Sequence, residues 1–317
     1  GFTAGAALLH APPVERVLVC EIVPGVIAAA RTHFRPYVHG LFDDPRVRVV
    51  AEDGRSRLRW TRERFDVVVG DLFFPWDAGA GDLYTLEHFR AVRERLAEGG
   101  LFAQWLPLYQ ISRREFDVVA RTLLEAFPLV TLWRGDFFGA EPILALVGHR
   151  DDGALDPAAL SARLRQAGAA EHGDAPLQNL AQGVEKAAGA GRAPASDTAR
   201  LLLYYCGNLT AARDLFRAAP LNTDDRPVIE YATPVTHRRQ HAGKVEWMIG
   251  TALIGFFEDL SRAAPLAKDP YLRNVSPELH ESVKAGLHLY RSEALGAEGD
   301  AVRADVERGE YQRCVGK

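Results

Sequence analysis

The sequence predicts an α/β fold in which a mainly parallel sheet is flanked by helices. Three short apolar runs each end on an acid, at Glu21, at Glu52-Asp53 and at Asp71. Between Phe65 and Gln104 the chain shows the pattern strand, turn-rich loop, amphipathic helix and strand, which is the unit that builds parallel sheets. Ligands of such sheets bind outside the carboxyl ends of the strands, and the three acids fall there.

Strand and helix patterns alternate over about the first 150 residues. The periodicity predicts helices over 24–34, 86–97 and 113–126, and strands over 16–21, 47–52, 65–71, 101–106, 129–134 and 142–148. We expect Glu98-Gly99-Gly100 to stop the second helix, and the last two strands to form an antiparallel hairpin at the edge of the sheet. Residues 151–196, rich in Ala, Gly and Asp, predict a linker or insertion, and residues 197–317 predict a mainly helical C-terminal region.

Glycines and an acid near the start of the chain indicate a nucleoside site. Gly1 and Gly5 precede a short helical pattern, and Glu21 follows Gly1 by 20 residues, the spacing at which nucleotide-binding sheets place an acid on the ribose. Glycine lets the backbone approach a ligand, and the acid accepts hydrogen bonds from both ribose hydroxyls. We therefore expect Glu21, Asp53 and Asp71 to lie at one edge of the sheet and to share a site.

Longer motifs around these acids resemble the spermidine synthase family. They are CEIVPGVIAAAR at Glu21, EDGR at Asp53, FDVVVGD ending at Asp71, and LYTLEHF over residues 83–89. The segments FAQWLP (102–107) and NTDDRPVIEY (222–231) are closer to a bacterial branch in which this domain follows a membrane-spanning region. The resemblance extends over residues 1–148 and returns at 222–234.

The resemblance implies a fold, a cofactor and a set of roles. It implies a Rossmann-like class I methyltransferase sheet with helices on both faces, over residues 1–150, that binds an adenosyl cofactor. Glu21 would bind the ribose hydroxyls, Asp53 and Gly54 would lie near the adenine, and Asp71 would face the attacking amine as the catalytic residue. The co-substrate would be decarboxylated S-adenosylmethionine and the acceptor a small-molecule amine. Weaker candidates for binding the acceptor are Trp76, Tyr84 and Gln104, which lie at or near strand ends.

Two departures from the family pattern bear on the acceptor. Spermidine synthases usually carry a second acid three residues after the strand-end acid, and here that position is Phe74. The tyrosine- and proline-containing motif that closes the polyamine pocket has no clear counterpart. Asp77 or Asp82, in the same loop, could replace the missing acid. Because a diamine needs acids to hold its second ammonium group, the apolar Phe74 predicts that putrescine is a poor acceptor.

Three functions therefore stay open at this stage. The first is aminopropyl transfer from decarboxylated S-adenosylmethionine to an amine. The second is methyl transfer from S-adenosylmethionine itself, which the apolar Phe74 and the absent polyamine motif leave open. The third is a non-catalytic nucleoside-binding domain of a membrane protein. A group that binds the cofactor carboxylate would favour methyl transfer, because the decarboxylated cofactor has no carboxylate.

Composition limits the other function classes. The net charge of −4 argues against nucleic acid as a partner. Three widely spaced cysteines indicate neither a disulfide framework nor a zinc site, and the histidines show no metal-ligand spacing, so we expect no metal. The longest apolar runs are shorter than the 18 residues of a membrane span, so we expect this segment to be a cytoplasmic domain and any membrane anchor of the parent protein to lie upstream. A homodimer is compatible with these features.

The chain opens within or just after the glycine turn of the expected site, without an initiator methionine. We expect a first strand and its glycines to be missing, so that the sequence is a fragment. That strand would lie between the strands at Val17 and Val67, and its loss would leave two strand edges unpaired and the cofactor loop incomplete.

Overall fold

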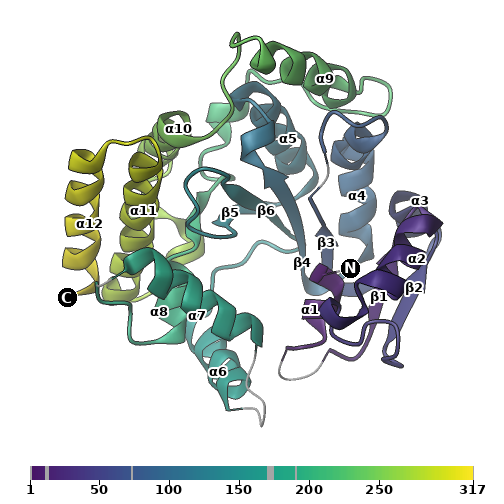
Figure 1. Cartoon of the computed structure of the whole chain (residues 1–317), viewed down its shortest axis with the longest axis horizontal. Helices are drawn as coiled ribbons and strands as arrows, with labels where there is room; N and C mark the ends of the chain where they lie inside the picture. The colour runs from purple at the N-terminus through teal and green to yellow at the C-terminus, as the bar shows by residue number, and fades with distance from the viewer. Residues whose placement is uncertain (1, 11–13, 73, 170–174, 190, 317) are drawn as a thin grey trace. The chain divides into compact units, whose positions relative to one another are not determined.

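The computed structural model describes residues 2–10, 14–72, 74–169, 175–189 and 191–316 (Figure 1). The chain forms two compact units. The N-terminal unit consists of residues 1–62 with 158–182, and the main unit of residues 63–157 with 183–317. The domain boundaries expected near residues 150 and 196 remain a prediction, although the expected linker contains two helices, α6 (Pro157–Gly168) and α7 (Ala175–Ala188).

A two-stranded parallel sheet forms the centre of the N-terminal unit. Strand β1 pairs with β2 in a register that places Val17 opposite Val47 and Cys20 opposite Val50. The core beside this sheet is formed by the buried side chains of Leu8, Val38 and Leu41. The elements are α1 (Phe2–Ala7), β1 (Val17–Cys20), α2 (Pro24–His33), β2 (Val47–Val50) and α3 (Gly54–Trp60). Pro24 occupies the first turn of α2, where its missing N–H costs no helical hydrogen bond.

A mixed five-stranded sheet forms the centre of the main unit, in the order β3-β4-β6-β5-β7. Strands β3 and β4 are parallel, and every other described pair is antiparallel. The strands are β3 (Phe65–Gly70), β4 (Leu96–Pro107), β5 (Leu129–Arg134), β6 (Ile143–His149) and β7 (Tyr205–Asn208). Strand β3 ends the order, and its Val67 and Val69 are 58% and 44% exposed.

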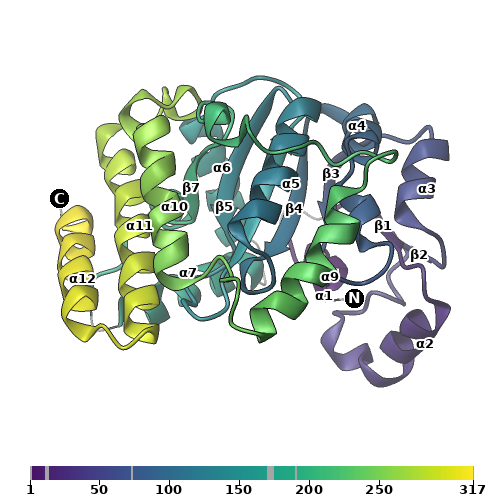
Figure 2. The same ribbon diagram turned by 90° about the horizontal axis from the view of Figure 1, so that it is seen from above.

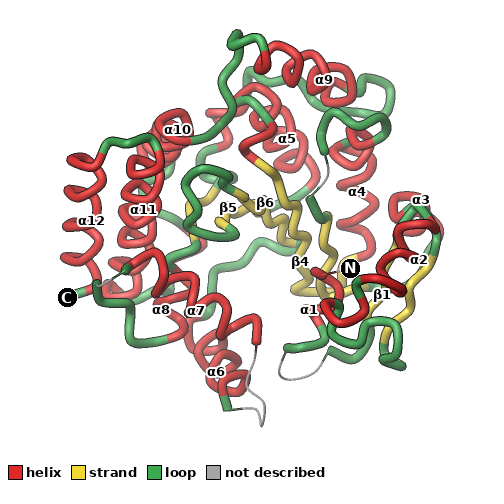
Figure 3. Tube along the Cα trace, viewed as in Figure 1, coloured by secondary structure: helices red, strands yellow, loops and turns green. Residues whose placement is uncertain are grey.

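Helices of the main unit lie around this sheet (Figure 3). Thr85 caps α4 through its side chain, and Ser112 with Glu115 forms a capping box at the start of α5. Rings of the sheet and of the chain after α5 pack together, as Phe102 of β4 stacks on Phe127 with centroids 5.9 Å apart. These helices are α4 (Leu86–Arg95), α5 (Arg113–Ala126), α8 (Asp197–Leu202) and α9 (Val228–His241).

The C-terminal region is helical, as the sequence predicts. Helices α10 (Gly250–Ala263), α11 (Pro277–Ala297) and α12 (Ala301–Val315) lie side by side (Figure 2). A buried cluster joins the sheet to this region through Leu129 of β5, Tyr205 of β7 and Val283 of α11. The α/β fold class with a mixed sheet and a helical C-terminal region is therefore confirmed. Among the described residues, no helix is both long and apolar enough to span a membrane.

Three local predictions were wrong. Helix α4 ends at Arg95 and β4 starts at Leu96, so Gly99, at φ +70°, lies within an irregular strand instead of ending a helix. The register of β3 with β4 also shifts here: Phe65 pairs with Leu96, but Val67 pairs with Leu101. The hairpin of β5 and β6 does not close the sheet, because β7 pairs with β5 beyond it. Strand β7 lies within residues 197–218, where apolar residues recur at a helical period and predict helix.

Candidate active site

The N-terminal unit brings two of the strand-end acids to the same edge of its sheet. Strands β1 and β2 are parallel, and the pairing continues past them because the Glu21 N–H donates to the Val50 carbonyl at 3.1 Å. Glu21 and Asp53 both follow the carboxyl ends of their strands. The Oε1 atom of Glu21 accepts a hydrogen bond of 2.8 Å from the Val23 N–H, which orients the carboxylate. Its Oε2 atom has no hydrogen-bond partner in the described part of the chain, so one oxygen can accept from a ligand.

Asp53 starts helix α3. Its carboxylate accepts hydrogen bonds from the backbone N–H groups of Arg55 and Ser56, both at 3.1 Å, and from the Ser56 hydroxyl at 2.6 Å. Partial burial raises the pKa of Asp53, but the hydrogen bonds from Ser56 and Arg55 outweigh it and hold the pKa below its ordinary value. Asp53 is therefore an ionised helix cap, and this role accounts for its place without a ligand.

The glycines of the expected cofactor loop differ in what the structure says of them. Gly1 lies outside the described residues. Gly5 is buried in α1, and a Cβ atom there would lie 2.5 Å from the Val38 carbonyl oxygen, so the packing of α1 requires glycine. A Cβ on Gly54 would lie 3.5 Å from the Cβ of Cys20, an ordinary contact. The cofactor role of all three remains a prediction.

In the main unit, Asp71 directly follows β3, and Gln104 lies beside the end of that strand, within β4. Gly70, the last residue of β3, pairs with Gln104 of β4, and the exposed Asp71 follows directly. A Cβ on Gly70 would lie 2.5 Å from Gln104 Oε1, so glycine leaves the room that the amide occupies. Asp71 Oδ1 accepts a hydrogen bond of 2.9 Å from the Leu72 N–H. The two side chains therefore share one edge of the sheet.

The amide of Gln104 is buried and only half satisfied. The side chain is 0% exposed, and Nε2 donates to the carbonyls of Trp105 at 3.1 Å and Gly70 at 3.4 Å. Oε1 is buried and has no hydrogen-bond partner among the described residues. A buried acceptor without a donor costs about 1–3 kcal/mol. A ligand N–H or O–H that reached this oxygen would recover that free energy.

Helix α9 holds the loop that follows Asp71. The carboxylate of Glu230 accepts hydrogen bonds from the backbone N–H groups of Gly79 at 2.8 Å and Gly81 at 3.0 Å. Gly79 has φ +87°, and a Cβ on Gly81 would lie 2.7 Å from the Glu230 backbone nitrogen, so both positions require glycine. The Thr233 hydroxyl donates to the Pro75 carbonyl. The loop over residues 74–84 is thus fixed at three points by one helix.

Asn222 links the same loop to the start of α9. Its Nδ2 donates to the Gly81 carbonyl at 3.0 Å, and its Oδ1 accepts from the Ile229 N–H at 3.0 Å. The Asn222 carbonyl also accepts from the N–H of Leu86 at 2.9 Å. Asn222 is fully buried, so each of these bonds is protected from water. Asn222 therefore ties the loop to the start of α9, in a segment (222–227) whose sequence indicates only a polar turn.

Aromatic side chains of the loop take two different positions. Trp76 stacks on His237 of α9 with ring centroids 4.0 Å apart, and Phe74, 56% exposed, lies 5.7 Å from Trp76. Tyr84 is 1% exposed, and burial raises the pKa of its hydroxyl well above the ordinary value. Tyr84 therefore packs in the core in this structure. The substrate-binding roles predicted for Trp76 and Tyr84 remain predictions.

The predicted site residues divide between the two units. Glu21, Asp53 and Gly54 belong to the N-terminal unit, and Asp71 with Gln104 belongs to the main unit. The shared site of all three acids therefore stays a prediction. Among the described residues, no group of three or more His, Cys, Asp or Glu side chains is placed to hold a metal ion.

The sequence reasoning missed Glu230 and Thr233. Their partners lie about 150 residues away in the chain, at Gly79, Gly81 and Pro75. The Gly79-Ala80-Gly81 sequence was a usable signal, because closely spaced glycines in a loop often mark a close backbone approach. Nothing in the sequence, however, pointed from those glycines to a carboxylate on a distant helix.

Comparison with known proteins finds similarity over part of the chain. Residues 6–132 match the model of the spermine/spermidine synthase domain. The chain is 29% identical over 164 residues to polyamine aminopropyltransferase 2 of Hyperthermus butylicus, covering 51% of this chain and 53% of that protein. It is 32% identical over 137 residues to the polyamine aminopropyltransferase of Thermotoga maritima, covering 43% and 45%. A solved spermidine synthase in complex with the transition-state analogue AdoDATO is 25% identical, with a TM-score of 0.44 and coverage of 51% and 57%. The chain spans about half the length of these relatives.

Proposed function

We propose that this protein transfers an aminopropyl group from decarboxylated S-adenosylmethionine to an amine. The observation that carries the proposal is that Asp71, directly after β3, lies beside Gln104 of β4, whose buried Oε1 has no hydrogen-bond donor among the described residues. An amine supplies the missing N–H. The match of residues 6–132 to the spermine/spermidine synthase domain and the names of the relatives support the same chemistry.

The proposed reaction needs no covalent intermediate with the protein. The sulfonium of the co-substrate activates the carbon next to it, so the amine nitrogen attacks that carbon while the carbon–sulfur bond breaks and its electron pair stays on sulfur. Asp71 orients the amine and accepts its proton as the new carbon–nitrogen bond forms. Gln104 Oε1 accepts a second N–H of the amine and fixes the direction of attack. The Oε2 atom of Glu21 accepts hydrogen bonds from the ribose hydroxyls of the co-substrate.

The loop held by α9 forms a wall of the acceptor site in this proposal. Phe74 gives that wall an exposed apolar side chain at the position where an acid would hold a second ammonium group. A singly charged amine with an alkyl chain therefore suits the site better than putrescine. Phe74→Asp should raise the use of putrescine relative to a monoamine of the same length, and an unchanged ratio in product analysis would remove Phe74 from the acceptor site.

Turnover of an Asp71→Asn variant tests the catalytic role. The substitution keeps the shape but removes the base, so turnover should fall by about 10²–10⁴-fold while co-substrate affinity stays nearly constant. Asp66→Asn is the matched control, because Asp66 lies near the start of β3, whereas Asp71 directly follows its end. Full activity of Asp71→Asn would exclude Asp71 as the base.

Methyl transfer is the second candidate, favoured by the apolar Phe74 beside the expected acceptor position. Calorimetry with decarboxylated S-adenosylmethionine and S-adenosylmethionine side by side separates the two reactions. Tighter binding of the decarboxylated form, with an aminopropylated product by mass spectrometry, is the expected result. Tighter binding of S-adenosylmethionine with a methylated product would replace the proposal, and binding of both without any product would indicate a non-catalytic nucleoside-binding domain.

A further inference from the structure

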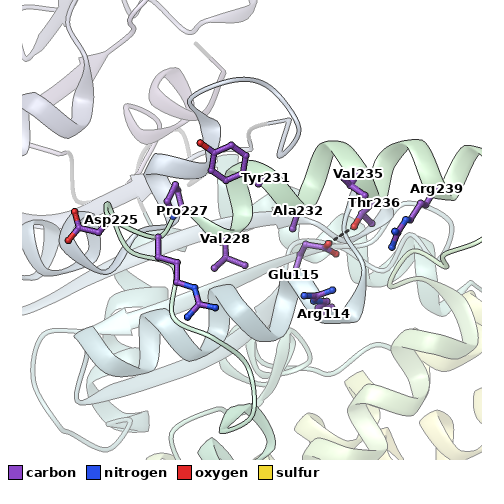
Figure 4. Close-up of a pocket in the computed structure, with 11 residues that line it drawn as sticks. Arg114, Glu115, Asp225, Pro227, Val228, Tyr231, Ala232, Val235, Thr236 and Arg239 are labelled. Carbon is purple, nitrogen blue, oxygen red and sulfur yellow. Dashed lines mark hydrogen bonds between the residues drawn. The ribbon is translucent and has the colours of Figure 1, made fainter.

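A groove of about 560 Å³ lies between α5 and α9 of the main unit, and neither Asp71 nor Gln104 lines it (Figure 4). Its volume falls in the range of ligand sites. Its positive charge comes from Arg114 in the first turn of α5, Arg226 just before α9, and Arg239 in the last turn of α9. All three arginines are exposed, and within the described residues none makes an ion pair or donates a side-chain hydrogen bond. We call this feature the arginine groove.

The acids of the arginine groove do not neutralise these arginines. Glu115 is 2% exposed, and its carboxylate accepts hydrogen bonds from the Ser112 backbone, the Ser112 hydroxyl and the Thr236 hydroxyl, the last drawn in Figure 4. The Glu115 carboxylate is therefore held by hydrogen bonds at the start of α5 and does not pair with the arginines. Asp225 is the other acid of the lining, and Figure 4 shows it toward the end opposite Arg239. The groove is thus locally positive on a chain whose net charge is −4.

An apolar strip forms the floor between the charged ends. Val228, Ala232 and Val235 recur at the spacing that places side chains on one face of α9, and Figure 4 shows them between Asp225 and Arg239. Val235 is 43% exposed, and the neighbouring Tyr231 is 73% exposed. A ligand that fits must therefore combine negative charge with aliphatic surface.

The length of the groove selects among anionic ligands. Val228 and Arg239 are separated by 11 residues of helix, which at the helical rise of 1.5 Å per residue is about 16 Å. An extended polypeptide advances about 3.3 Å per residue, so about five residues span that length. Arginine pairs with carboxylates through two parallel hydrogen bonds, and clusters of arginines are a known means of recognising acidic motifs. A nucleic acid strand would present sugars and phosphates to the apolar strip and bases to a single tyrosine.

We propose that the arginine groove binds an extended acidic segment, about five residues long, of a partner protein. The carboxylates of the segment pair with the three arginines, and its aliphatic side chains cover the apolar strip. This site is separate from the proposed catalytic site and does not depend on the reaction that is catalysed there.

Fluorescence anisotropy with labelled hexapeptides tests the proposal. The probes are a peptide of alternating Glu and Val, the same peptide with Gln for Glu, the dipeptide Glu-Val, and a six-nucleotide RNA. We expect the hexapeptide of alternating Glu and Val to bind more tightly than the other three probes. Its affinity should fall as the salt concentration rises, because exposed ion pairs are screened. Each exposed pair contributes little, so Arg114→Gln or Arg239→Gln should weaken binding by about two- to fivefold and the double variant by about 4- to 25-fold.

A double variant on α12 provides the matched control. Arg303→Gln with Arg313→Gln removes the same charge from exposed positions, 61% and 70% exposed, outside the groove, and should leave the affinity unchanged. Val235→Asp should weaken binding of the acidic peptide by placing an acid on the apolar strip. Equal affinity of the groove and control double variants overturns the site. Tighter binding of the RNA at the same arginines overturns the class of partner, and equal binding of the dipeptide overturns the extended mode.

Discussion

Replacing Glu230 by glutamine should release the loop that follows Asp71. The Glu230 carboxylate accepts backbone N–H bonds of 2.8 Å from Gly79 and 3.0 Å from Gly81. Glutamine keeps one accepting oxygen but turns an NH₂ group toward the other N–H, so one bond is lost and the remaining one loses its charge. Bonds to a charged group contribute about 1.5–3 kcal/mol each, and because Glu230 is partly exposed we take the lower part, about 1.5–2 kcal/mol.

Amide hydrogen exchange measures this change directly. A local opening made about 1.5–2 kcal/mol easier should exchange about 10- to 30-fold faster, since 1.4 kcal/mol corresponds to a factor of ten. Mass spectrometry of peptides from residues 74–85 should show this acceleration in Glu230→Gln, with the sheet unaffected. Glu246→Gln, the same change at an exposed residue whose side chain makes no hydrogen bond or ion pair in the described part of the chain, is the control. Equal exchange in the two variants would refute the idea that this carboxylate holds the loop.

Three further outcomes are expected. Glu21→Gln should weaken adenosyl co-substrate binding by about 1–3 kcal/mol in calorimetry, the scale of a lost charge-assisted hydrogen bond, and unchanged affinity would rule out the ribose assignment. Burial lowers the pKa of His149 from 6.5 to about 4, so the unfolded chain binds the proton more readily than the folded chain. Up to about 3 kcal/mol of the stability present above pH 6.5 should therefore be lost as the pH falls to 4. In urea unfolding, His149→Gln should not show this loss. Gly5→Ala forces a Cβ against the Val38 carbonyl and should destabilise by about 1–3 kcal/mol in thermal unfolding. Gly25→Ala, whose Cβ would make only an ordinary contact of 4.0 Å with the Val23 side chain, should not.

Elements whose limits are set by neighbouring residues were predicted well. Helix α5 occupies 113–126, as expected, because Ser112 and Glu115 form a capping box at its start and an amphipathic period runs through it. Strand β5 occupies 129–134, also as expected, because it is a short apolar run bounded by polar and turn residues. These signals lie within a few residues of the element that they define.

Elements whose secondary structure depends on a distant partner were predicted poorly. Tyr205–Asn208 lies in a stretch with helical periodicity, yet it forms β7 because β5 offers an antiparallel edge to it. The start of β4 at Leu96 follows from its pairing with Phe65, which the Glu98-Gly99-Gly100 signal for a helix end could not reveal. In both cases the hydrogen bonds of the sheet decided against the local preference.

The candidate site divides in the same way. The sequence by itself determined which acids follow strands, because a strand end is a local property, and it predicted that Gln104 lies near Asp71, because β3 and β4 read as consecutive parallel strands. Only the tertiary structure decided that Gln104 keeps a buried oxygen without a donor among the described residues, and that Glu230, 149 residues from Gly81, holds the loop over residues 74–84. The reason is physical: a hydrogen bond between such distant residues exists only once the whole intervening chain has folded, and no local pattern records the path that the backbone takes.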